Sequence, residues 1–271
     1  MSWTLDDIPW QQLDRGAVEP DLLRVVKAAA LVEGRSGDYA DYLCNVFADD
    51  PEFQAQARAW GREEVQHGAA LGAWAERVDP AFRYDEALQR MRAGYALPTD
   101  ALTSIRGSRS AELVARCVVE CGTSSFYSAI RDASAEPVLK AIAHRIAGDE
   151  FRHYQLFLKT LRRYRKRQPL GLARRLRVAL GRIGETGDDE LAFAYYCANC
   201  GRDQAYDREA CATAYEIGAA RLYRPGHVAR MVAMISKAVG LDPQGWPVRQ
   251  LQRLTWRFFC WRRRRLEARL A

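Results

Sequence analysis

The sequence predicts an all-α protein in which a four-helix bundle is followed by additional C-terminal helices. Apolar residues recur at intervals of three and four over long windows, and the period-two alternation of a half-buried strand is absent. Prolines follow acidic residues at the breaks between windows, as in Asp50-Pro51 and Asp79-Pro80. A chain of 271 residues, 48% of them hydrophobic, is also long enough to bury a large core.

Four long helices are predicted first, at about Asp21–Ala48, Glu52–Val78, Ser110–Ala133 and Glu136–Arg165. The stretch Pro80–Arg109 should hold a short helix around Tyr84–Gly94 and cross from one helix pair to the other, which is typical of a bundle with one long crossover. Three further helices are predicted near Asp188–Arg221, Pro225–Val239 and Trp246–Leu270. We therefore expect a bundle domain over residues 1–183 and a C-terminal helical extension with a basic tail over residues 184–271.

Composition narrows the class of protein. The first 23 residues lack the apolar stretch of a signal peptide, and no apolar run approaches the roughly 18 residues of a membrane-spanning helix. The seven cysteines are odd in number and scattered, which disfavours a disulfide framework and favours a reducing compartment. We expect a cytoplasmic protein that is at most peripheral to a membrane.

Each of the four long helices carries one glutamate within its apolar face. Two of these glutamates are followed by a histidine three residues later, a spacing that places carboxylate and imidazole side by side on one helical face. The four glutamates are separated by 31, 56 and 30 residues, so the chain contains two similar helix hairpins. The residues are Glu33, Glu64 with His67, Glu120, and Glu150 with His153.

The apolar neighbours of these residues predict that all six side chains are buried. Four buried carboxylates without counter-charge would be strongly disfavoured, whereas two divalent cations would balance four glutamates and two neutral histidines. Mixed carboxylate and imidazole ligands with open positions suit iron or manganese better than the closed sites of zinc. The sequence therefore predicts a buried site for two metal ions.

This pattern resembles the ferritin-like di-iron carboxylate superfamily, whose bundles take one Glu from two helices and Glu-x-x-His from the other two. The residues of the motifs are most similar to those of the soluble acyl-carrier-protein desaturases. Their E-E-x-R-H resembles Glu63-Glu64-Val-Gln66-His67, in which Gln66 replaces the arginine. Their D-E-x-R-H matches Asp149-Glu150-Phe-Arg152-His153, and their third-helix Glu followed by an active-site Thr looks like Glu120-x-x-Thr123. The resemblance covers about residues 20–165.

The resemblance implies a ferritin-like bundle holding two iron ions, or one manganese and one iron, and a di-iron oxidoreductase that uses O₂ to desaturate or hydroxylate an unactivated C–H bond. The substrate would be acyl or lipid-like. It further implies that Glu63 and Asp149 orient the ligating histidines, that Arg152 pairs with one of these acids, and that Thr123 relays a proton. No organic cofactor site is expected, so electrons would come from a separate donor such as a ferredoxin. We also expect a homodimer.

Several alternatives stay open on the sequence alone. The chain could be a rubrerythrin-like peroxidase or ferroxidase without organic substrate, or a binding protein pinned by metal; it lacks the paired C-x-x-C domain of rubrerythrins. Thr123 could be a core threonine bonded back to its own helix, and Arg152 a solvated residue. Small residues beside the ligands, such as Gly34 and Gly122, could serve close packing or leave a cavity. Cys197 and Cys200 are interpreted as core thiols rather than a zinc or redox pair.

The net charge of +7 is unevenly distributed. Residues 151–184 contain eleven Lys or Arg and no acid, and residues 248–271 contain eight Arg and one Glu, so the remaining chain is net acidic. This favours an acidic carrier protein or an anionic membrane surface as partner. Nucleic acid is not expected, because no nucleic-acid-binding motif accompanies the charge. Charge reversal at Arg262–Arg265 should therefore lower substrate affinity in a salt-sensitive way without changing iron content.

Overall fold

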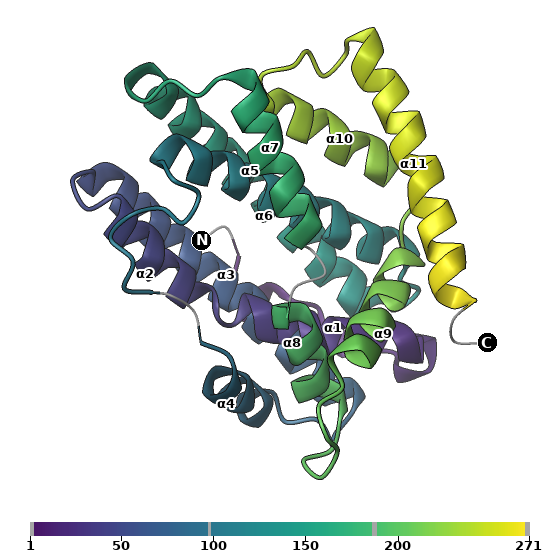
Figure 1. Cartoon of the computed structure of the whole chain (residues 1–271). Helices are drawn as coiled ribbons and strands as arrows, with labels where there is room; N and C mark the ends of the chain where they lie inside the picture. The colour runs from purple at the N-terminus through teal and green to yellow at the C-terminus, as the bar shows by residue number, and fades with distance from the viewer. Residues whose placement is uncertain (1–2, 97–98, 186–188, 269–271) are drawn as a thin grey trace. The chain divides into compact units, whose positions relative to one another are not determined.

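The computed structural model describes residues 3–96, 99–185 and 189–268, and within these ranges it contains helices and no strand (Figure 1). The all-α prediction is confirmed, whereas the ferritin-like arrangement stays a prediction. Three short 3₁₀ helices at Leu5–Asp7, Trp10–Gln12 and Arg15–Ala17 precede the first α-helix. The α-helices are α1 (Pro20–Glu33), α2 (Ser36–Val46), α3 (Pro51–Val78), α4 (Tyr84–Gly94), α5 (Arg109–Ala133), α6 (Pro137–Arg167), α7 (Leu172–Gly184), α8 (Asp189–Asn199), α9 (Arg208–Ala220), α10 (Pro225–Val239) and α11 (Trp246–Glu267).

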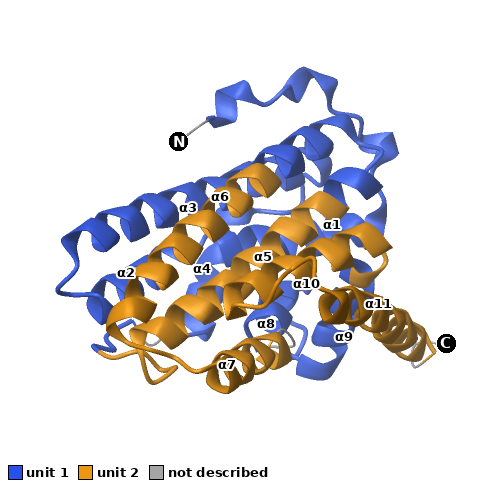
Figure 2. Cartoon of the chain, turned by 90° about the horizontal axis from the view of Figure 1, so that it is seen from above, with its two compact units in different colours: residues 1–102, 130–145, 187–219 blue, residues 103–129, 146–186, 220–271 orange. Residues whose placement is uncertain are grey.

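The chain forms two compact units, each assembled from separate segments (Figure 2). Unit 1 comprises residues 1–102, 130–145 and 187–219, and unit 2 comprises residues 103–129, 146–186 and 220–271. Helices α5 and α6 contribute residues to both units. The predicted division into residues 1–183 and 184–271 stays a prediction.

In unit 1, helix α1 packs along α3 and α8, and α2 packs against α3. The proline at the start of α3 and the Asp50 side chain, which accepts a hydrogen bond from the Phe53 amide at 3.1 Å, define the helix start as the sequence predicted. Leu31, Phe53 and Trp74 are among its fully buried side chains. Burial of these large apolar groups is the main force holding the unit together.

The predicted single helix Asp21–Ala48 is wrong in one respect, because it is divided into α1 and α2. At the junction the Arg35 amide bonds the carbonyl of Val32 at 3.1 Å, and the Asp38 amide bonds that of Arg35 at 3.0 Å. These bonds span three residues instead of four, and they tighten the turn and end the α-helical register. Gly34 and Gly37 lower the local helix propensity further.

The predicted helix Asp188–Arg221 is likewise divided, into α8 and α9, and its predicted first residue lies outside the described residues. Gly201 lies in the intervening loop, and the Asp207 side chain accepts a hydrogen bond from the Ala210 amide at 2.9 Å. This bond caps a new helix start that the apolar pattern concealed. Helix α7, within the first basic stretch, was not predicted.

In unit 2, hydrogen bonds tie the helices to one another. The Ser124 hydroxyl of α5 donates to the Ala147 carbonyl of α6 at 3.3 Å, and the Tyr154 hydroxyl of α6 donates to the Met234 carbonyl of α10 at 2.8 Å. Helices α10 and α11 have the predicted bounds, except that the predicted end of α11 at Leu270 lies outside the described residues. No helix within the described ranges is long and apolar enough to cross a membrane.

Candidate metal centre

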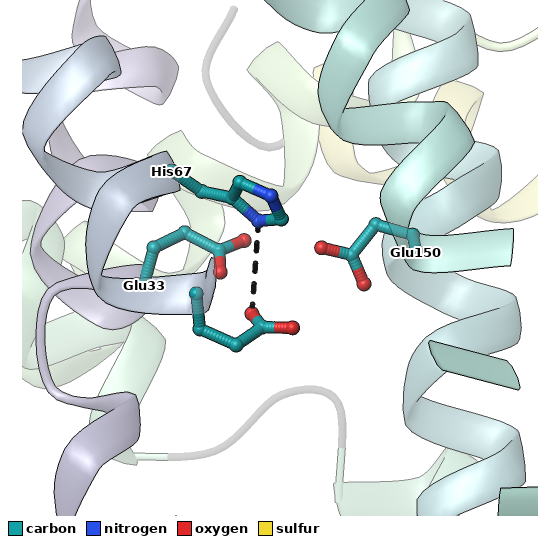
Figure 3. A group of neighbouring side chains, drawn as sticks. Glu33, His67 and Glu150 are labelled. Carbon is teal, nitrogen blue, oxygen red and sulfur yellow. Dashed lines mark ion pairs between the residues drawn. The ribbon is translucent and has the colours of Figure 1, made fainter. Parts of the chain in front are cut away.

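Unit 1 brings together three of the predicted ligands. Glu33 is the last residue of α1, and Glu64 and His67 lie one turn apart on α3. One potential ligand atom from each lies within 4.8 Å of the others. Figure 3 shows Glu33 and His67 pointing toward one another, and its dashed line marks the 4.0 Å approach of the His67 Nδ1 to a Glu64 carboxylate oxygen. All three side chains are buried.

Close contact between two backbones positions this group. A Cβ atom added to Gly68 would lie 2.5 Å from the Gly34 nitrogen, which is shorter than any side chain tolerates. Glycine at position 68 therefore lets α3 touch the end of α1 directly. Because Gly34 follows Glu33 and Gly68 follows His67, this contact brings the two ligands together.

Unit 2 contains a second group with the same composition. Glu120 lies on α5, and Glu150, labelled in Figure 3, lies on α6 with His153 one turn later. Their potential ligand atoms also lie within 4.8 Å of one another. The His153 Nδ1 is 3.8 Å from a Glu120 oxygen and 3.9 Å from a Glu150 oxygen. These side chains are at most 3% exposed, so bulk water does not screen their charges.

Thr123 contacts this second group. Its hydroxyl lies 2.6 Å from the Glu150 Oε2 and 3.3 Å from the carbonyls of Val119 and Glu120. A hydroxyl has one proton to donate, and a short bond to a carboxylate is stronger than a long bond to a neutral carbonyl. The geometry therefore favours a Thr123 that donates to Glu150 over one that only bonds back to its helix.

The residues predicted to support the ligands are placed as follows. Asp149 is buried and accepts hydrogen bonds from the Arg152 Nη1 at 3.0 Å and Nη2 at 2.7 Å, so the predicted ion pair of Arg152 with an acid is present. Glu63 is half-buried on α3. The roles of Glu63 and Asp149 in orienting histidines stay predictions.

Sequence reasoning missed Trp3. Its indole ring is parallel to the His67 imidazole, with an interplanar angle of 4° and ring centroids 6.0 Å apart. The Gln66 Nε2 donates a hydrogen bond of 2.9 Å to the Trp3 carbonyl. The Gln66 amide thus anchors the N-terminal segment beside His67. The E-E-x-R-H motif that this stretch resembles has an arginine at this position. The replacement itself was the available signal, but nothing in the sequence linked it to a residue so far away in the chain.

The small residues near the ligands differ in what surrounds them. Gly34 and Gly68 allow close packing, whereas a Cβ atom added to Gly37 or Gly122 would meet nothing within 4 Å. Space therefore remains beside α5 at Gly122, two residues after Glu120. Nearby, burial raises the pKa of the Cys121 thiol well above its usual value, which keeps it protonated at neutral pH.

The cysteines at positions 197, 200 and 211 belong to neither of these groups. Cys197 and Cys211 are buried, Cys200 is half-buried, and none of them forms a disulfide. Burial raises the pKa of Cys197 and of Cys211 to about 11. Within the described ranges, the groups capable of holding a metal contain no cysteine, and the interpretation of Cys197 and Cys200 as core thiols stays a prediction.

The donor atoms of the two groups fit divalent metal ions. Each group offers two carboxylates and one imidazole, so a divalent cation and a neutral histidine would leave it electrically neutral. Oxygen-rich ligand sets with one nitrogen suit iron and manganese.

This chain matches no protein-family model and no curated protein, so its functional interpretation depends on these residues.

Proposed function

We propose that this protein is a non-haem di-iron oxidoreductase that uses O₂ to desaturate or hydroxylate an unactivated C–H bond of an acyl or lipid-like substrate. The observation that carries the proposal is the repeated buried set, in which a single Glu from one helix joins Glu-x-x-His from a second helix, once in each unit. Structural zinc sites use cysteine and histidine instead, whereas this ligand set is typical of helix bundles that hold two iron or manganese ions.

We further propose that the two groups belong to one dinuclear centre within a ferritin-like bundle. Support comes from the sequence, where the intervals within the two hairpins are 31 and 30 residues, and from the resemblance of the motifs to those of the acyl-carrier-protein desaturases. Glu33, Glu64 and His67 would hold one ion. Glu120, Glu150 and His153 would hold the other.

When bound, the iron pair would supply the electron transfer to O₂ and the oxidising power for C–H attack. The chain's own residues would bind, orient and exclude water. The Thr123 Oγ1 lies 2.6 Å from the Glu150 Oε2 and can donate its proton to that carboxylate. The Trp3 ring lies parallel to that of His67, and His67 is fully buried, which limits access of water to that ligand.

The reaction balances only with an external reductant. Desaturation removes two hydrogens from the substrate, and these, with two electrons from the donor and two protons from solvent, reduce O₂ to two waters. Hydroxylation inserts one oxygen atom and releases one water for the same two electrons. A ferredoxin-type donor fits this requirement, since the sequence carries no flavin or iron–sulfur motif.

Metal binding can be tested before any substrate is known. Protein reconstituted anaerobically with Fe(II) should bind two irons per chain, and Mössbauer spectroscopy after exposure to O₂ should show a magnetically coupled pair. Glu64→Gln and Glu150→Gln should each lower iron content, whereas Glu190→Gln, which alters a buried carboxylate outside both groups, should not. Full iron content in both ligand variants, or an O₂-exposed protein without a magnetically coupled iron pair, would refute the di-iron proposal.

The reaction itself is tested by mass spectrometry. Reduced, iron-loaded protein is exposed to O₂ with long-chain acyl thioesters of coenzyme A or of acyl carrier protein. A product lacking two hydrogens or gaining one oxygen atom would support the proposal. Rapid turnover of hydrogen peroxide, with the acyl chain unchanged, would instead identify the peroxidase alternative.

A further inference from the structure

The inner face of helix α11 packs against α10 and the segment before it. The Trp256 ring stacks on the Phe259 ring with centroids 5.9 Å apart, and the Phe259 and Tyr223 ring centroids are 5.3 Å apart. Val248 packs with Val228 and Val232 of α10 in one hydrophobic cluster. These contacts hold the helix against α10, and the opposite face of the helix is exposed.

The outer face of α11 carries an exposed apolar stripe. Leu251, Leu254, Phe258 and Trp261 follow one another at intervals of three, four and three, which places them along one side of the helix. Their exposed fractions are 47%, 60%, 57% and 52%. Trp246, at the start of the helix, is 66% exposed. Large apolar side chains that lie together in water usually mark an interaction surface.

Arginines flank this stripe on both sides. Between Trp246 and Glu267 the helix has seven arginines and one acid, and that acid, Glu267, forms an ion pair with Arg221. The arginines that are exposed beside the stripe include Arg253, Arg257, Arg262, Arg264 and Arg265. The partner of this face must therefore be both apolar and anionic.

A second copy of this helix does not fit. The spacing of the stripe is that of a coiled-coil seam, in which Arg257 and Arg262 would occupy the flanking positions that pair across the interface. Both are positive, so pairing α11 with another α11 would place like charges opposite one another. The homodimer predicted from the sequence would need another face.

We propose that α11 docks on the interface of a membrane rich in anionic lipids, with its apolar stripe inserted among the acyl chains nearest the headgroups. Trp, Phe and Leu on one side with arginines beside them are typical of helices that lie in this interface. Arginine side chains can extend to phosphate groups while their aliphatic parts stay in the apolar layer. This inference stands on the geometry of α11 alone and does not depend on the metal centre.

An acidic protein surface would satisfy the arginines but not the stripe. Four large apolar side chains, each about half exposed or more, would remain in water or require a matching groove. A lipid interface needs no matching shape, because acyl chains adapt to whatever inserts. The combination of a continuous apolar stripe and dispersed positive charge thus favours the membrane.

The proposal is tested by flotation of the full-length protein with vesicles of phosphatidylcholine alone or of phosphatidylcholine mixed with phosphatidylglycerol. The protein should float with the anionic vesicles, and the double variant Leu254→Glu, Phe258→Glu should bind them roughly tenfold more weakly or worse. Leu102→Glu is the matched control, since Leu102 is 75% exposed and lies outside α11, and it should bind like the unaltered protein. Circular dichroism checks that each variant is folded.

Charge reversal of Arg262, Arg264 and Arg265 separates attraction from insertion. It should abolish flotation, and added salt should weaken binding of the unaltered protein. Absence of binding to anionic vesicles would overturn the proposal. So would a loss of binding by charge reversal with none from the Leu254 and Phe258 changes, because that result would show electrostatic attraction without insertion of the apolar stripe.

Discussion

Gly68 touches the backbone of Gly34 so closely that a Cβ atom at position 68 would lie 2.5 Å from the Gly34 nitrogen and 2.8 Å from its Cα. The obstacle is backbone, which cannot rotate away as a side chain could. Both glycines immediately follow ligand candidates, Glu33 and His67. This contact therefore couples the stability of the α1–α3 packing to the geometry of the first group.

Gly68→Ala should destabilise the protein by about 1–3 kcal/mol, because the added methyl forces α1 and α3 apart. It should also lower iron content by disturbing Glu33. Gly37→Ala is the control: its added methyl meets nothing within 4 Å, so it should be neutral or stabilise α2 by up to about 1 kcal/mol. Urea unfolding measures both, and equal stabilities for the two variants would contradict the close contact.

Thr123→Val should lower the rate of substrate oxidation by at least roughly tenfold, because it removes the hydroxyl that donates to Glu150. Iron content should stay near that of the unaltered protein, since Thr123 is not itself a predicted ligand. Thr123→Ser keeps the hydroxyl and should restore most of the rate. Single-turnover oxidation of the reduced protein by O₂ is the measurement. A valine variant as fast as the serine variant would remove Thr123 from the reaction.

Removal of iron should lower the melting temperature at neutral pH. Each unit then holds two facing buried carboxylates without a cation, and they repel one another in a region of low dielectric constant. Each ion at about 100 times its Kd adds about 2.7 kcal/mol, which corresponds to a shift of roughly 5–10 °C per ion for a chain of this size. Calorimetry of the apo and iron-loaded forms measures it. Equal melting temperatures would argue against a buried site.

Asp79→Asn should make stability less dependent on pH below neutrality. The Lys27 Nζ lies 2.5 Å from the Asp79 carboxylate and lowers its pKa below the usual 3.8. A carboxyl with a lowered pKa stabilises the fold above its unfolded pKa, and this contribution is lost as pH falls through the folded value. We expect the variant to be less stable by about 1 kcal/mol at pH 7, since Asp79 is partly solvated, and the difference to vanish as the pH falls well below 4.

The matched control for this titration is Asp100→Asn, because Asp100 is exposed. Its stability difference from the unaltered protein should be small at every pH. Denaturant unfolding at a series of pH values gives both curves. A constant deficit of Asp79→Asn across the acid range would show that its charge is not what stabilises the end of α3.

Gln66→Leu should release the N-terminal segment from His67. It removes the hydrogen bond to the Trp3 carbonyl, which is worth about 1 kcal/mol. Hydrogen exchange of the segment before α1 should become faster, and a chelator should extract iron sooner. Gln56→Leu, at another half-buried glutamine of α3, should do neither. Unchanged exchange in the Gln66 variant would show that Trp3 is held by other contacts.

Local pattern was enough to place most helices. Prolines and capping side chains mark helix starts, and α3, α4 and α10 begin and end within a residue or so of their predicted bounds. Periodicity failed where two helices share one apolar face across a tight turn. The break after Gly34 and the loop between α8 and α9 interrupt the hydrogen bonding without interrupting the apolar pattern.

The sequence by itself determined the ligand candidates and their grouping into two hairpins, because a spacing of three on a helix fixes which side chains share a face. Only the tertiary structure decided what surrounds them. The Gly34–Gly68 contact, the short bond from Thr123 to Glu150 and the stacking of Trp3 on His67 join residues from different elements. No local rule encodes such contacts, since they depend on how packing brings separate parts of the chain to within a few ångströms.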